Sequence, residues 1–164
     1  MNWAKINQEV VKALVNGLKW GELPHCWIND GEYIMVTLDG FAGYFIPKDK
    51  VKFVVEGKEI NKPFERSSNV IVPENEIRPT NTYVKAGYNQ RYFMRMFKGV
   101  ESGKTWKTYV DEKMLKPLER EGNVKFYQFD KFKEPNVRPI LAADDDVPLM
   151  LLMPVRVDED SEFD

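Results

Sequence analysis

The feature that most constrains the fold of this chain is an approximate internal repeat. Near the N-terminus, Asn7 can cap a helix over about residues 8–19, in which apolar residues recur at three- and four-residue spacing. A second copy begins at residues 106–110, which alternate like a strand, and continues into a helix that Asp111 can cap. Shifting the first copy by 104 positions superimposes the two caps and the apolar positions of the two helices. Such self-similarity predicts one domain built from two related units.

Strand-like runs follow both predicted helices. Residues 33–38 and 41–46 flank Asp39-Gly40, a dipeptide that favours the tight turn of a β-hairpin. Three further apolar runs follow the second helix, at residues 124–129, 138–142 and 149–157. We therefore expect an α+β fold in which two pseudo-symmetric strand–helix–strands units place both helices on one face of antiparallel sheets.

Three segments fit this scheme less simply. Residues 61–82 contain several prolines among short apolar runs, so we interpret them as a connection with one edge strand. Residues 90–98 fit either a helix with one apolar stripe or a buried strand. Pro117 falls inside the second predicted helix, which must therefore be short or kinked.

Length and composition agree with a single domain. A chain of 164 residues with 43% apolar and 13% aromatic residues can fill one core. The expected layout is a domain over residues 1–157, with units at about 1–60 and 104–157, a connection over 61–103 and a tail over 158–164. No run approaches the ~18 consecutive apolar residues of a membrane span, so we expect no membrane contact. The lack of a secretion-signal pattern and the single cysteine, Cys26, favour a cytoplasmic location.

The charge is distributed unevenly along the chain, although the net charge is only −2. Residues 1–84 carry a net charge of −1, residues 85–138 carry +6 and residues 139–164 carry −7. The last seven residues are mostly acidic and have no apolar periodicity, so we expect a tail without fixed structure. Two roles are open for this tail. It could compete in cis with DNA for the basic region, or it could present Phe163 to a pocket on a partner protein.

Few residues carry recognisable chemistry. One histidine and one cysteine cannot supply the four ligands of a structural zinc site, and no glycine-rich phosphate loop is present. Asp144-Asp145-Asp146 could hold Mg²⁺ in a nuclease, but consecutive turn residues point in different directions, and a hairpin turn is the expected structure. His25-Cys26 could supply a base and a nucleophile, but sequence neighbours seldom have catalytic geometry. We therefore expect no enzyme, no metal site and no cofactor.

Residues 83–109 have a composition that suits base stacking beside phosphate contacts, because aromatic and basic side chains alternate there. The alternative is that these rings belong to the core, as regularly spaced aromatic residues usually do. The aromatic residues are Tyr83, Tyr88, Tyr92, Phe93 and Trp106, and the basic ones are Arg91, Arg95, Lys98, Lys104 and Lys107.

The second unit and the C-terminal sequence together resemble one domain of the bacterial DNA sliding clamp, the processivity β subunit of the replicative polymerase. Residues 108–115, Thr-Tyr-Val-Asp-Glu-Lys-Met-Leu, look like the strand-to-helix entry of the clamp's third domain. Residues 138–141 and 149–157 are similar to its last hairpin and its terminal Met-Pro-x-Arg signature. The likeness covers residues 104–157 by motif and residues 3–55 by pattern.

This resemblance implies a non-enzymatic protein that contacts duplex DNA and assembles with itself. Clamp subunits string three such domains together, so a ring would need several copies of this chain, joined by pairing of edge strands. In clamps the helices face the central hole, and their basic side chains meet DNA phosphates without reading sequence. The positions that would do so here are Lys12, Lys19, Lys113, Lys116 and Arg120.

The resemblance also implies a partner-binding pocket at the end of the domain. In the clamp family the terminal segment helps to line a pocket for short peptides, which an adjacent domain completes. The corresponding residues here are Met153, Pro154, Val155 and Arg156. An alternative of another class is a protein-interaction module of phage or plasmid type that mimics a clamp surface and binds no DNA.

Overall fold

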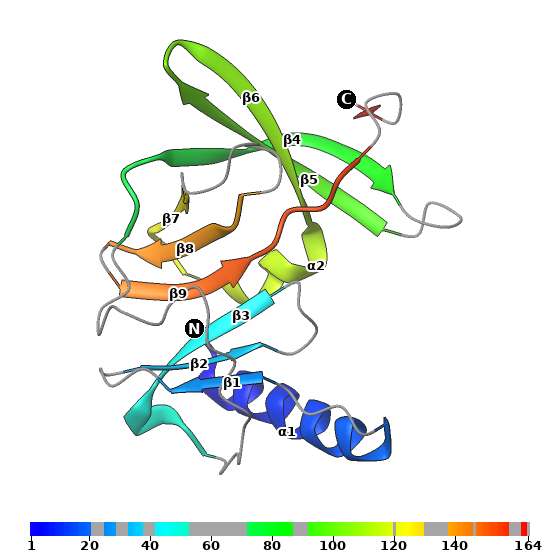
Figure 1. Cartoon of the computed structure of the whole chain (residues 1–164), viewed down its shortest axis with the longest axis vertical. Coiled ribbons are helices and arrows are strands. Elements are labelled where there is room, and N and C mark those ends of the chain that lie inside the picture. Colours follow the sequence, from blue (N-terminus) through cyan, green and yellow to red (C-terminus); the bar gives the residue numbers. More distant parts are fainter. Residues whose placement is uncertain are drawn as a thin grey trace.

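A computed structural model describes residues 1–20, 25–28, 33–37, 42–52, 72–86, 92–119, 121–129, 138–145, 147–157 and 162–163. Within these ranges, side chains are not described for residues 13, 14, 16–20, 25–28, 33–37, 162 and 163. The described chain is mostly antiparallel sheet with few helices (Figure 1). The predicted α+β class is confirmed at this level.

The described helical elements are α1 (Trp3–Trp20), the single turn η1 (Lys48–Lys50), and α2 (Glu112–Leu115), which continues as η3 (Lys116–Leu118). The described strands are β1 (His25–Ile28), β2 (Tyr33–Thr37), β3 (Ala42–Pro47), β4 (Glu76–Ala86), β5 (Tyr92–Glu101), β6 (Lys104–Asp111), β7 (Val124–Gln128), β8 (Ile140–Asp144), β9 (Val147–Leu152) and β10 (Glu162–Phe163). They pair in the order β1-β2-β3-β9-β8-β7-β4-β5-β6, and β10 adds to β4.

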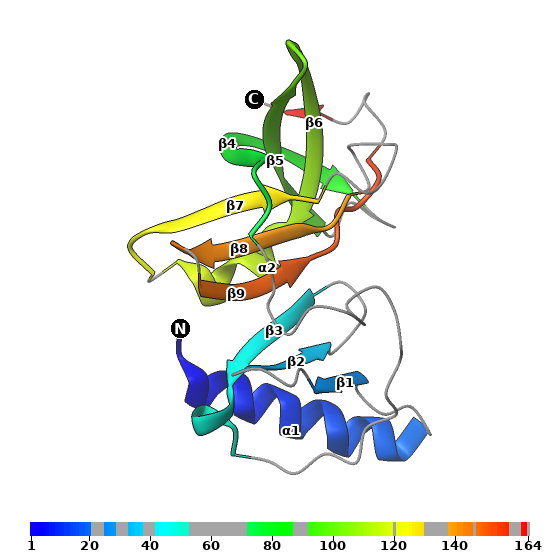
Figure 2. The same cartoon turned by 60° about the vertical axis from the view of Figure 1, so that its left-hand side comes forward.

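The main core lies between the helices and one face of this sheet. Ile6 and Val10 of α1 share a buried cluster with Leu115 of α2 and Leu118 of η3. The strand members of the cluster alternate along each strand, and include Tyr44, Ile46, Ile140, Ala142, Met150 and Leu152. Figure 2 shows α1 running beneath β1–β3 and α2 beside β8 and β9. Both helices therefore contribute to the same core.

The opposite face of the central strands holds a smaller cluster. Phe45, Leu141 and Leu151 are buried there, and Val72 and Phe129 pack against them. Because β3, β8 and β9 are covered on both faces, their sequences are almost uniformly apolar.

The strand β4 joins this layer to a second one by changing partners along its length. Glu76 and Ile77 pair with β7, whereas the rest of β4 pairs with β5 across an irregularity between Pro79 and Tyr83. At this bulge the Thr80 hydroxyl donates to the Met96 carbonyl at 2.9 Å. The β5–β6 hairpin then extends away from the body of the molecule (Figures 1 and 2).

The C-terminal segment crosses this second layer. Val84, Met94, Met96 and Tyr109 form a third buried cluster, and Val155 and Val157 pack against it. The Val155 N–H also donates to the Tyr109 carbonyl at 2.8 Å. Residues 153–157 thus cover the apolar face of β4, β5 and β6.

The helix α1 differs from the prediction at its start. It begins at Trp3 rather than near residue 8, and the Asn2 side chain accepts from the Lys5 N–H at 3.1 Å. Asn7 is therefore inside the helix and is no cap. It is buried, and its side chain contacts residues 50 and 52, which follow β3.

The interpretation of residues 61–82 as a connection with one edge strand is wrong for its second part. Glu76–Ala86 is an 11-residue strand that pairs on both sides. Residues 90–98 belong to a strand, β5, which settles the ambiguity between helix and strand. The tail, for which we expected no fixed structure, contains β10, two residues long and paired with β4.

The predictions made from neighbouring residues around α2 are confirmed. The Asp111 side chain accepts from the Lys113 N–H at 2.9 Å, as expected of a cap. The helix changes to a 3-10 turn at Lys116 next to Pro117, so it is short, as predicted. The hairpin of β2 and β3 is also confirmed, although its Asp39-Gly40 turn lies outside the described residues, as do residues 53–71. None of the helices in the described part has both the length and the apolarity to cross a bilayer.

Candidate nucleic-acid interface

The basic residues predicted on the helices occupy exposed positions where the structure describes them. Lys12 of α1 forms an exposed ion pair with Glu9 at 3.1 Å, which is worth about 0–1 kcal/mol and offsets part of its charge. Lys113 and Lys116 are exposed on α2 and η3. The Lys19 side chain and Arg120 lie outside the described residues. The shortness of α2 leaves room for few of the predicted phosphate contacts.

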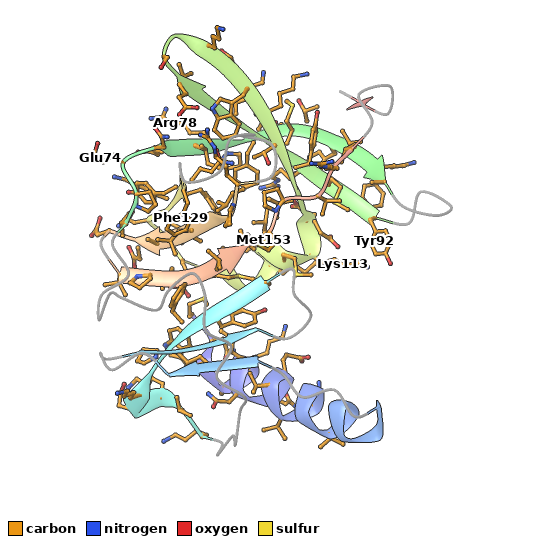
Figure 3. The ribbon with its side chains drawn as sticks, in the orientation of Figure 1. Glu74, Arg78, Tyr92, Lys113, Phe129 and Met153 are labelled. Atoms are coloured by element: carbon orange, nitrogen blue, oxygen red, sulfur yellow. The ribbon has the colours of Figure 1, made fainter. Side chains whose placement is uncertain are left out.

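The segment predicted to border a partner pocket lies along the second layer. Met153 lies just after β9 (Figure 3); it is half-buried, as is Pro154, and Arg156 is exposed. Val155 packs on the Val84 cluster and hydrogen-bonds to β6. Val155 is thus engaged within the chain's own fold.

Three aromatic rings and three cations gather where β4 ends and β5 begins. The Arg95 guanidinium lies 5.2 Å from the centre of the Tyr83 ring, and Lys85 Nζ lies 5.8 Å from that of Phe93. Lys113 Nζ lies 5.7 Å from the Tyr92 ring, and Figure 3 shows these two residues side by side. We call the four of these residues that share one face of the sheet the aromatic–cation patch: Tyr83, Lys85, Phe93 and Arg95.

The register of β4 and β5 explains most of the patch. Tyr83 faces Arg95 and Lys85 faces Phe93, and Val84 faces Met94 between them. Because Val84 and Met94 are buried in the third cluster, strand alternation places the other four side chains on the opposite face of the sheet. Tyr92, one residue before Phe93, points to the other face of the sheet, and Lys113 reaches it there because α2 begins directly after β6, the neighbour of β5.

Arg95 is the anchored member of the patch. Its guanidinium forms an ion pair with Glu112 of α2 at 2.8 Å and donates to the Tyr83 hydroxyl. Burial raises the pKa of the Glu112 carboxyl, and the positive charge of Arg95 partly offsets this rise. Arg95 therefore ties the sheet to α2 and fixes the Tyr83 ring.

A second basic group lies on the other face of the same sheet. The register aligns Arg78 of β4 with Lys98 of β5, and Lys98 with Lys107 of β6. All three residues are exposed, and Figure 3 places Arg78 on β4. Arg78 forms an exposed ion pair with Glu76 at 3.4 Å, which offsets part of the charge of this row.

The other sequence candidates show no active-site arrangement in the part of the chain that is described. Asp144 and Val147 are the last pair of the β8–β9 ladder, so Asp144 and Asp145 lie at the expected hairpin turn, with Asp145 at a φ of 49°. Asp146 and the side chains of His25 and Cys26 lie outside the description. No group of three or more potential metal ligands occurs among the described residues.

Sequence reasoning identified residues 83–109 as a region but not which of its members would meet. It missed Arg78 and Lys85, which become neighbours of the predicted residues only through the register of β4. Trp106, in contrast, packs over Gly99 on β5 and against the main core. Tyr88 and Arg91 lie outside the described residues.

Comparisons with protein-family models, with curated proteins and with solved structures found no match to this chain. Any functional conclusion therefore rests on its own residues and geometry.

Proposed function

We propose that this protein is a non-enzymatic, clamp-like DNA-binding protein that contacts duplex phosphates and assembles through its sheet edges. The observation that carries the proposal is the order of the strands. The path β1-β2-β3-β9-β8-β7 reads as two triplets in mirror order, each preceded by a helix in the chain. The last strands of the triplets, β3 and β9, pair antiparallel at the centre. A local two-fold axis between them would exchange the two units.

Two further features support related units. A two-fold axis perpendicular to the sheet keeps both helices on one face, and α1 and α2 do share one core cluster. The equivalent strands also end near a proline, since β3 finishes at Pro47 and β9 ends at Leu152, two residues before Pro154. These are the features on which the resemblance to one domain of a sliding clamp depends.

The contact with DNA would be electrostatic. Lys12, Lys113 and Lys116 are exposed on the helical elements and can each meet a phosphate without reading the base sequence. Assembly would use the end of the strand path. Within the described residues β1 pairs with β2 alone, which leaves a strand edge that a second copy can extend.

Salt-dependent binding of a fluorescent DNA duplex tests the phosphate contact. The Lys12→Gln/Lys116→Gln variant should weaken binding and lower the slope of log affinity against log salt by about two units. Lys48→Gln/Lys125→Gln, which also removes two exposed lysines, is the matched control and should leave the slope unchanged. Equal slopes for both double variants would contradict the helical contact.

Light scattering over a range of concentrations, with and without the duplex, tests the assembly. A closed oligomer that is favoured by DNA at low salt agrees with a ring of identical subunits. A monomer that is indifferent to DNA at every concentration contradicts it.

A monomer that is indifferent to DNA would favour a protein-interaction module. One observation already supports this second candidate function. Val11 and Val15 lie one turn apart on α1 and are 43% and 52% exposed. An apolar pair on a helix surface suits contact with another protein. Loss of a protein complex in Val11→Lys, with DNA affinity unchanged, would identify this use of the helix.

A further inference from the structure

The strand β4 has one edge that is only partly covered. β5 and β10 both pair with Tyr83 and Val84, and a strand has two edges, so β10 lies on the edge opposite β5. β7 lies on that same edge, because β4 separates β7 from β5 in the sheet, and it pairs there with Glu76 and Ile77. Among the described strands, none pairs with the other residues of β4 on this edge.

The middle of this edge is protected against a further strand. Pro79 has no N–H to donate, and the Thr82 N–H donates to the Thr80 hydroxyl at 3.1 Å. The irregularity between Pro79 and Tyr83 also interrupts the regular edge. Prolines and bulges of this kind keep sheet edges from pairing with other chains. Residues 83–86 have neither feature, and we call them the docking edge.

The C-terminal tail of this chain is a segment whose backbone fits the docking edge. Phe163 takes the position opposite Tyr83, and Glu162 the position opposite Val84, in antiparallel register. Five of the last seven residues are acidic, whereas residues 85–138 carry a net charge of +6. The tail and the region around the docking edge are thus complementary in charge, which favours their association.

We propose that the C-terminal tail of one copy of this chain docks on the docking edge of a second copy. The tail would add a strand to the sheet of its neighbour. Every copy carries both parts, so two copies that exchange tails form a closed dimer, and copies that each pass the tail to the next can form a ring. The inference rests on the self-assembly in the proposed function, for which it supplies a contact besides the edge of β1, and it needs no DNA.

Exchange between copies requires little change in the fold. It keeps the pairing that the tail makes within one chain, which is the reason that such exchange is a low-cost route to dimers. β10 holds the docking edge through two residues, so the contact to be exchanged is small. Val155 and Val157 stay in place, because both pack on the third cluster and the Val155 N–H donates to the Tyr109 carbonyl. Only the residues after Val157 need to change partner.

The length of the tail limits how far away the second copy can lie. Five residue steps lead from Val157 to Glu162, and an extended chain spans at most about 17 Å over that length. The second copy must therefore lie against the second layer of the first. Phe93 is opposite Lys85 of the docking edge and is 52% exposed. A neighbour at this distance can cover that ring, which accounts for an exposed aromatic residue beside the docking edge.

Light scattering of the full chain over a range of concentrations, without DNA, tests the exchange. The molar mass should rise with concentration. Glu162→Pro removes the backbone N–H from β10, so the concentration at which half of the chains associate should rise about five-fold or more. Glu162→Gln removes the same charge but keeps the N–H, and this matched control should change that concentration by about two-fold or less.

A synthetic peptide of residues 158–164 separates docking of the tail from other contacts between copies. Added to the full chain, it should compete for the docking edge and lower the molar mass. A labelled peptide should bind the chain shortened after Val157 more tightly than the full chain, because the linked tail competes at an effective concentration in the mM range. A Phe163→Ala peptide should bind about five-fold or more weakly, since it lacks the ring opposite Tyr83.

The outcomes separate this inference from the proposed function. Association that is weakened by Glu162→Pro and retained by Glu162→Gln supports docking of the tail on a second copy. Equal association of both variants and the unmodified protein overturns it and leaves self-assembly to the edge of β1. A full chain that stays monomeric overturns it together with the proposed assembly, even if the shortened chain binds the peptide, because the tail then pairs only within its own chain. The duplex contact is tested separately by its salt dependence, and circular dichroism checks that each variant keeps its fold.

Discussion

Substitution of Asn7 should destabilise this protein more than the loss of a helix cap would. Its side-chain amide donates to the Trp3 carbonyl at 2.7 Å and to the Lys50 carbonyl at 3.0 Å. Its oxygen accepts from the Lys52 N–H at 2.7 Å. Three hydrogen bonds at a net contribution of roughly 0.5–1.5 kcal/mol each predict a loss of about 2–4 kcal/mol for Asn7→Ala. Asn2→Ala, which removes the actual cap, should cost about 1 kcal/mol.

The variant Asn7→Asp distinguishes more sharply between a helix cap at this position and a buried side chain that bonds to the backbone. Asparagine and aspartate are equally good caps, so a cap at this position would tolerate the change. In the observed geometry the new carboxylate would face two carbonyl oxygens without a proton to donate. Its folded-state pKa would then lie above its unfolded value, so the loss of stability should be present at neutral pH and shrink as the pH falls toward the ordinary value of about 4.

Urea unfolding, followed by circular dichroism at pH 7 and at pH 4, measures both effects. A lower midpoint with an unchanged slope reports a change in the free energy of unfolding. Two results would refute the reasoning: an Asn7→Ala loss below about 0.5 kcal/mol, or an Asn7→Asp variant as stable at pH 7 as the unmodified protein.

Three further substitutions test the second layer. Gly99→Ala would place a methyl group 2.1 Å from Trp106 Cζ2, so it should cost roughly 1–3 kcal/mol and shift the tryptophan fluorescence; an unchanged unfolding midpoint would contradict this packing. Because burial raises the folded-state pKa of Glu112, the unmodified protein should lose stability relative to Glu112→Gln as the pH rises from 4 to 7. The charge of Arg95 limits this effect. A stability difference between the two proteins that stays constant over this pH range would contradict the raised pKa. Asp111→Ala should cost about 1 kcal/mol in urea unfolding and Asp111→Asn much less, since asparagine can also cap α2; equal losses would exclude the capping role.

The elements that could be predicted from the sequence are those decided by neighbouring residues. Asp111 caps α2 through a bond to the backbone two residues away, and Pro117 limits the helix by its own missing N–H. The β2–β3 hairpin follows from two apolar runs around a tight turn. No long-range information is needed for any of these.

The strand β4 could not be predicted in this way. Only Ile77 and Val84 are buried along its 11 residues, so it has no clear two-residue period. Pro79 also gave the appearance of a loop, because it cannot donate to a ladder. The structure accommodates it beside a bulge, where the Thr80 hydroxyl bonds to β5 instead. Asn7 was misread for a related reason, since two of its three hydrogen-bond partners lie 43 and 45 residues away.

The sequence predicted which stretch of the chain holds the candidate site, but not which side chains of that stretch are exposed. Composition alone cannot separate Trp106, which packs over Gly99, from Phe93, which is 52% exposed, although both rings lie among basic residues. The separation is made by the register of β5 with β4 and with β6, and one residue of slip would exchange the buried and exposed sets. The pairing of β4 with β5 brings Lys85 over Phe93, and the pairing of β4 with β10 sets Tyr83 opposite Phe163 of the tail. Because β4 takes part in both pairings, a substitution that shifts β4 should change the surroundings of Phe93 and the position of the tail together.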